Sequence, residues 1–260
     1  MNDKSPLILT RDGGVAKLCF NRPEALNAID VPMAHAFLTA VRTISIDPAV
    51  RAVLLCGAGK AFMAGGDLSV LRSDPVAGAA ALITPLHEAV VVLSKIDAPV
   101  IAQVHGVAAG AGLSLMLQAD FVVAATNTNF NFAYVKIGAS CDAGGSWSLP
   151  RIVGLRKALE LSLLSETIDA RAALRLGLIN SVVEHQDLES GAMALAQRLA
   201  AGPSVALGHV RRLMRGAFSN NLRTQLEAEA KAFESCAETS DFRKGVDAFF
   251  ARKSALFIGN

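Results

Sequence analysis

The stretch PVIAQVHGVAAGAGLSLMLQADFVVAA, residues 99–125, decides the fold. A β-branched run at 100–104 is followed by a loop of small residues at 106–112, a helix-like run at 113–118 and a second apolar strand at 121–125. This order of strand, loop, helix and strand predicts an α/β fold.

The small-residue loop predicts a site for a negatively charged group. Glycine and alanine leave the backbone uncovered, so a ligand can reach main-chain N–H groups, and the start of the next helix adds partial positive charge. An anion or a developing oxyanion suits such a loop. Close packing of a helix on a sheet would explain the same small residues. A membrane span is disfavoured because Gln103, His105 and Gln118 interrupt the apolar run.

Length and composition indicate one large domain, or one domain with a helical appendage, in 260 residues. A hydrophobic content of 52% with 18% charged residues argues against disorder. The net charge of +2 gives no general attraction to nucleic acid or anionic membranes, so neither is expected as a partner. The first ten residues lack a long apolar segment, so we expect no secretory signal and a cytoplasmic location.

The four cysteines and five histidines show no metal-type spacing. In a cytosolic chain the cysteines are expected to be reduced thiols. The dinucleotide-binding glycine pattern is also absent from both glycine-rich loops. We therefore expect no metal and no nicotinamide cofactor.

A second glycine-rich loop, GAGKAFMAGGDL at 57–68, follows an expected buried strand at 51–56. The chain before it predicts a hairpin at 7–20 and a helix at 31–43 that Asp30 caps. Both loops therefore leave the carboxyl ends of strands, where open α/β sheets bind ligands.

The rest of the chain is expected to be mainly helical. Helices are predicted at 77–93 and, after residue 150, at 151–164, from 169 to 176 and near 188–200, 204–218, 222–236 and 242–252, with a short strand near 179–183. Between them, 126–150 mixes turn formers with aromatic residues, which predicts a pocket wall with a bend at 142–145.

Five motifs together carry a family resemblance: NRPEALNAID at 21–30, KAFMAGGDL at 60–68, the stretch at 99–125, VKIGASCDAGGSWSLPR at 135–151 and RKALELSLLSETIDARAALRLGLINSVV at 156–183. They resemble the enoyl-CoA hydratase/isomerase (crotonase) family over nearly the whole chain. The resemblance implies a spiral of ββα turns at 1–200 and a C-terminal helical trimerisation region at 201–260. It also implies a homotrimer or a dimer of trimers, and an acyl-CoA thioester as substrate with no separate cofactor.

The same resemblance assigns the catalytic groups. It implies that the N–H groups of Ala64 and Ala111 hold the thioester oxygen. Hydratases of the family use two glutamates, and Ser114 and Tyr134 stand at those positions here, so hydration by a glutamate pair is in doubt. The carboxylate left in the segment is Asp142, which we expect to be the single base.

Several reactions are compatible with an aspartate at position 142. Its surroundings resemble the ring-epoxide isomerase branch of bacterial phenylacetate breakdown, whose members also shift 3-enoyl to 2-enoyl thioesters. The same position holds the nucleophilic aspartate of 4-chlorobenzoyl-CoA dehalogenase, which keeps a hydrolytic reaction open. Weak hydration, a non-catalytic acyl-CoA-binding relative, and a loop-capping role for Asp142 toward Gly144 and Gly145 are further alternatives.

Substrate contacts are also expected from the resemblance. Ala25 and Leu26 would contact CoA through their backbone. Arg252 and Lys253, of the same or a neighbouring subunit, would bind its phosphates; a solvated tail is the alternative for that pair. Asp67 is expected near substrate, although capping of a helix explains it as well. The full set of expected substrate-binding residues is Ala25, Leu26, Gly65, Gly66, Asp67, Leu68, Gly110, Ser114, Tyr134, Trp147, Arg252 and Lys253.

Overall fold

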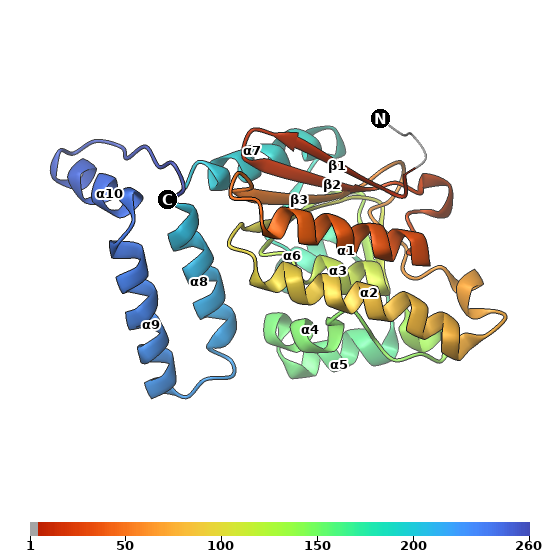
Figure 1. Cartoon of the computed structure of the whole chain (residues 1–260). Coiled ribbons are helices and arrows are strands. Elements are labelled where there is room, and N and C mark those ends of the chain that lie inside the picture. The colour runs from red at the N-terminus through yellow and green to blue at the C-terminus, as the bar shows by residue number, and fades with distance from the viewer. Residues whose placement is uncertain (1–4) are drawn as a thin grey trace.

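The computed structural model describes residues 5–260 and has a six-stranded sheet at its centre (Figure 1). The strand order is β1-β2-β3-β4-β6-β9, in which β1 and β2 are antiparallel and every other neighbouring pair is parallel. The strands are β1 (Leu7–Asp12), β2 (Val15–Phe20), β3 (Ala52–Gly57), β4 (Val100–Val104), β6 (Phe121–Ala125) and β9 (Ser181–Val183). The predicted α/β class and the N-terminal hairpin are confirmed.

Helices cover both faces of this sheet. Val53 and Leu55 of β3 face a core that includes Phe37 of α1 (Val31–Ser45) and Leu86 of α2 (Pro75–Lys95). The alternate β3 residue Leu54 faces a second core built with α7 (Leu188–Ala200). A strand buried on both faces reads as a continuous apolar run, which is why β3 could be predicted.

A second, three-stranded sheet was not predicted. It consists of β5 (Val107–Ala109), β7 (Asn129–Asn131) and β8 (Ile168–Asp169). Strands of two or three residues are too short to show a periodic pattern, so the sequence offers little signal for them. β5 lies inside the small-residue loop of 106–112 and therefore gives that loop a fixed backbone course.

Helix starts follow the capping residues. Asp30 accepts the Met33 N–H at 2.8 Å, which starts α1, and Asp74 accepts the Ala77 N–H at 3.0 Å, which starts α2. By length and composition alone α2 could cross a membrane. Its Leu82, Leu86 and Leu93 lie in the protein core beside α1, so α2 is a helix of the folded body.

The second half of the chain is mainly helical, as predicted, with one difference. The helix expected at 151–164 is interrupted at Gly154, which has φ +77°: α4 (Gly145–Val153) starts earlier than predicted, and α5 (Leu155–Leu164) follows the glycine. The remaining elements are α3 (Ala111–Met116), α6 (Ala170–Arg175), α8 (Ser204–Gly216), α9 (Leu222–Ala237) and α10 (Ser240–Phe250), with short 3₁₀ turns η1 (Pro23–Ala25), η2 (Leu68–Leu71), η3 (Tyr134–Ile137) and η4 (His185–Asp187).

Helices α8, α9 and α10 extend to one side of the sheet (Figure 1). Two ion pairs fix α8 to the body: Asp120 accepts from the buried Arg211 at 2.5 Å and from the half-buried Arg215 at 2.7 Å. Large apolar side chains on α8 and α10, among them Met214, Phe249 and Phe250, are exposed in the single chain. The division into 1–200 and 201–260 stays a prediction.

Candidate active site

The two small-residue loops meet at the carboxyl ends of β3 and β4. Met63 and Ala108 form a β-bridge, in which Met63 donates to the Val107 carbonyl and accepts from the Ala109 N–H, both at 3.0 Å. A β-carbon added to Gly65 would lie 3.3 Å from the Ala109 carbonyl oxygen and 3.8 Å from the Ala111 nitrogen. The loops therefore lie together, as their position after two neighbouring strands predicts.

Ala64 does not supply the free N–H that the resemblance implied. Its N–H donates to the backbone carbonyl of Leu26 at 3.0 Å, a bond that fastens the 57–68 loop to the segment before α1. An N–H already satisfied by a protein carbonyl is not a preorganised donor for a substrate oxygen. The expectation for Ala64 is therefore corrected.

Gly66 offers the free N–H instead. It forms a parallel bridge with Ile29, in which Ile29 donates to the Gly65 carbonyl and accepts from the Asp67 N–H, each at 2.8 Å. In such a bridge the N–H and carbonyl of the central residue point to the opposite side. Among residues 5–260 no group accepts the Gly66 N–H.

Ala111 is the first residue of α3, and its N–H has no acceptor in the described part of the chain. The first N–H groups of a helix have no partner within the helix, so this donor can bind a ligand oxygen. Gly110 precedes it with φ +50°, a conformation that glycine adopts readily. Gly66 and Ala111 therefore present two unpaired N–H groups on adjoining loops.

Three side chains form a hydrogen-bonded row in the same region. Ser114 of α3 lies 2.9 Å from the hydroxyl of Tyr134 in η3, and that hydroxyl donates to Oδ1 of Asp142 at 2.5 Å. Ser114 and Tyr134 are buried, and Asp142 is half-buried. Three residues that the sequence singled out are thus brought together.

Burial raises the pKa values of both Asp142 and Tyr134 in this row. It raises the pKa of the Asp142 carboxyl, while the Tyr134 hydrogen bond and the nearby His87 imidazole oppose that rise. Burial and the Asp142 charge raise the pKa of Tyr134, so its hydroxyl stays protonated and can donate. The result is a carboxylate of increased basicity held by a neutral donor.

The bend that carries Asp142 is fixed through its neighbour. Ala143 has φ +47°, its N–H donates to Nε2 of His87 at 3.0 Å, and its carbonyl accepts from Nε2 of Gln118 at 3.1 Å. Gly145 donates to the backbone carbonyl of Asp142 at 2.9 Å, so the turn is closed by main-chain bonding. The sequence did not assign His87 a role, because a single histidine in an apolar helix matches no motif.

A second residue missed from the sequence is Asn27, which is fully buried. Its Nδ2 donates to the carbonyls of Ala58 and Ala61 at 2.9 and 2.8 Å, and its Oδ1 accepts the Arg22 N–H at 2.8 Å. Asn27 thus joins the NRPEALNAID segment to the second loop. A polar residue of the turn-forming type between apolar positions is the signal that was available.

Asp67 serves the alternative, structural role. It caps η2 by accepting from the hydroxyl and N–H of Ser69 at 2.7 and 3.1 Å, and it pairs with Arg22 at 3.0 Å. The Ser69 hydroxyl is the main cause that holds the pKa of Asp67 below its usual range. Leu26 and Leu68 carry exposed side chains.

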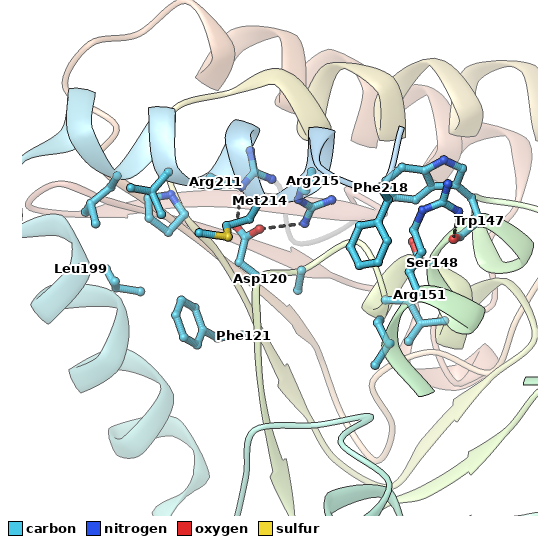
Figure 2. Close-up of a pocket in the computed structure, with 16 residues that line it drawn as sticks. Asp120, Phe121, Trp147, Ser148, Arg151, Leu199, Arg211, Met214, Arg215 and Phe218 are labelled. Atoms are coloured by element: carbon cyan, nitrogen blue, oxygen red, sulfur yellow. Dashed lines mark hydrogen bonds and ion pairs between the residues drawn. The ribbon is translucent and has the colours of Figure 1, made fainter. Parts of the chain in front are cut away.

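Trp147 lies elsewhere. The centre of its ring lies 4.1 Å from Cζ of the Arg151 guanidinium. The ring lines an apolar cavity of about 430 Å³ between α4, α8 and the start of β6 (Figure 2). Neither Tyr134 nor Asp142 lines this cavity. The expectation that Trp147 walls the acyl pocket is therefore not supported by its position.

Arg252 and Lys253 follow α10, which Figure 1 shows beyond α9 and α8 from the sheet. Their contact with CoA phosphates stays a prediction, as do the backbone contacts of Ala25 and Leu26. Within residues 5–260, no group of three His, Cys, Asp or Glu side chains is arranged to hold a metal ion.

Comparison with known proteins places the chain in a family. The family model described as enoyl-CoA hydratase/isomerase matches residues 10–260. The chain is 38% identical over 253 residues to 1,2-epoxyphenylacetyl-CoA isomerase of Escherichia coli K12, covering 95% of each, and 32% identical over 257 residues to crotonyl-CoA hydratase of Syntrophomonas wolfei, covering 97% of each.

Solved structures agree with the sequence comparison. An enoyl-CoA hydratase from Polaromonas sp. JS666 superposes with a TM-score of 0.91 at 36% identity, covering 97% of this chain and 99% of that one. The predicted crotonase fold is confirmed by this similarity. The chain therefore belongs to the enoyl-CoA hydratase/isomerase family.

Proposed function

We propose that this protein is an acyl-CoA isomerase with Asp142 as its single base. It shifts a 3-enoyl thioester to the 2-enoyl form, or rearranges a ring-derived acyl-CoA, through a thioester enolate. One observation carries the proposal: Asp142 is the carboxylate that lies in the hydrogen-bonded row, and the other two members, Ser114 and Tyr134, are neutral hydroxyls.

The enolate oxygen would be held by the N–H groups of Gly66 and Ala111. Both donors belong to backbone that the Ile29 bridge and the start of α3 already fix, so little reorganisation is needed as charge develops. A preorganised donor of this kind contributes about 3–4 kcal/mol to transition-state stabilisation. The half-buried setting increases that electrostatic effect.

Asp142 would move the proton. The Tyr134 hydroxyl donates to Oδ1, so Oδ2 would be the oxygen that reacts with the substrate. It would take a proton from C2 of the 3-enoyl thioester, giving a dienolate and a protonated Asp142, and then return the proton to C4. The double bond thereby moves from C3–C4 to C2–C3, and no water or external reductant is consumed. A raised carboxyl pKa suits both halves of this transfer.

Hydration is the second candidate, supported by the similarity to crotonyl-CoA hydratase. Water addition needs one group to activate water and a second to supply the proton at C2. Here Asp142 would have to do both, because Tyr134 holds its proton firmly. We therefore place hydration below isomerisation.

We also propose a homotrimer or a dimer of trimers. The exposed apolar side chains of α8 to α10, such as Met214 and Phe249, support association through these helices. In this assembly Arg252 and Lys253 would reach the CoA phosphates of a neighbouring subunit, while Ala25 and Leu26 would contact CoA through their backbone.

Two assays on the purified protein test the reaction type. With a 3-enoyl-CoA, ultraviolet absorbance should rise as the double bond becomes conjugated with the thioester. With a 2-enoyl-CoA, absorbance should fall much more slowly, because hydration removes that conjugation. A fast fall with the 2-enoyl substrate and no rise with the 3-enoyl substrate would establish hydration instead.

A further inference from the structure

The direction of the Asp142 side chain depends on the residue that follows it. Ala143 is fully buried at φ +47°, a left-handed conformation that residues with a side chain rarely adopt. Such a residue persists only where its surroundings fix it. Here both polar groups of Ala143 are bound by side chains, the N–H by His87 of α2 and the carbonyl by Gln118, which follows α3.

We infer that His87 is a positioning residue for the base, which holds the Ala143 N–H and thereby keeps Asp142 aimed at the substrate. This inference rests on the proposed role of Asp142. Accepting at Nε2 requires a neutral imidazole with its proton on Nδ1. The packing of α2 holds the backbone of His87 in place, because the neighbouring Leu86 is buried in the main core.

A protonated His87 would act differently. Its positive charge lowers the pKa of the Asp142 carboxyl against the effect of burial, but a proton on Nε2 leaves that atom unable to accept the Ala143 N–H. The Tyr134 hydroxyl faces the same carboxylate. Glu88, the next residue on α2, pairs instead with Arg42 of α1 at 3.4 Å. The bond to Ala143 and the effect of charge therefore belong to different protonation states of His87, and the neutral state positions Asp142.

Two variants test this positioning on a 3-enoyl-CoA. His87→Ala removes the acceptor at Nε2, so kcat should fall roughly 10- to 100-fold with KM little changed, because the base is misplaced and substrate binding is not. His87→Gln restores an acceptor near the place of Nε2, so kcat should recover to within about threefold of wild type.

His35→Gln on α1 is the matched control, because His35 is an exposed histidine outside the site and its replacement should change neither kcat nor KM. Melting temperatures check that each variant is folded. An unchanged kcat in His87→Ala, or a folded His87→Gln no more active than His87→Ala, would overturn the inference. If Asp142→Asn retains activity, the proposed function fails; if only Asp142→Asn loses it, the role of His87 alone fails.

Discussion

The Tyr134 hydroxyl donates to Oδ1 of Asp142 at 2.5 Å while it lies 2.9 Å from the Ser114 hydroxyl. Because the tyrosine proton points to the carboxylate, Ser114 must be the donor in the second contact. Ser114 and Tyr134, at the positions where the family resemblance implies glutamates in hydratases, thus support a third residue through hydrogen bonds. A single carboxylate with one free oxygen is what a proton shuttle requires.

Replacing Tyr134 by phenylalanine should raise the pKa of Asp142 further, because the lost hydrogen bond stabilises the ionised carboxylate. The base must be ionised to act, so the acid limb of kcat/KM should move to higher pH. Ser114→Ala is the matched control, since it keeps the Tyr134 to Asp142 bond. An acid limb that stays in place, or moves to lower pH, would argue against this bond in the working enzyme.

Removing the Gly66 N–H should impair catalysis without unfolding the protein. Gly66→Pro lacks the donor, and kcat should fall roughly 10²- to 10³-fold. Gly66→Ala keeps the N–H and places its β-carbon in open space, so it should remain close to wild type. The two variants are compared by steady-state kinetics and thermal melting. Equal activities would show that Gly66 is not the donor.

Asp142 should make the protein less stable at neutral pH than an uncharged replacement would. Its folded-state pKa is raised by burial, so its stabilising contribution is complete below the unfolded pKa of about 3.9 and is lost as pH rises through the folded value. Asp142→Asn should therefore gain melting temperature relative to wild type as pH increases from 3.5 to 7.5. A pH-independent difference between the two melting curves would contradict the raised pKa.

Arg211 should be essential for docking α8. Its side chain is buried, pairs with Asp120 at 2.5 Å and donates to the carbonyls of Ile96 and Leu93 at 2.7 and 3.1 Å. Arg211→Met should cost about 3–5 kcal/mol in urea unfolding, because it leaves buried charge and carbonyls without a partner. Arg212→Met, which removes an exposed pair with Asp97, should cost less than about 1 kcal/mol. Similar losses for both would refute this account.

Long elements with a clear apolar pattern could be predicted from the sequence. The strands at 100–104 and 121–125 have the predicted bounds, and Asp30 caps α1 as expected. Their signals are local: apolar runs, capping side chains and prolines. The short strands β5, β7 and β8 have no such signal, because long-range pairing alone defines them.

The two loops of the candidate site could be predicted from the sequence, but the individual N–H donors could not. Small residues mark the loop at 64–66, yet whether Ala64 or Gly66 offers a free N–H depends on Leu26 and Ile29, which pair with it from another part of the chain. Trp147 was expected at the acyl pocket, but its place on α4 turns it toward Arg151. His87 acts through a distant backbone N–H, a contact that only the folded chain reveals.

The most direct measurement compares wild type, Asp142→Asn and the control Asp169→Asn on a 3-enoyl-CoA, following the rise in ultraviolet absorbance. Asp169 caps α6 on the surface, a role that asparagine can also fill. Asp142→Asn should lose about 10²- to 10⁴-fold in rate while the control keeps the wild-type rate. A folded Asp142→Asn that isomerises as fast as wild type would contradict the claim that Asp142 is the base.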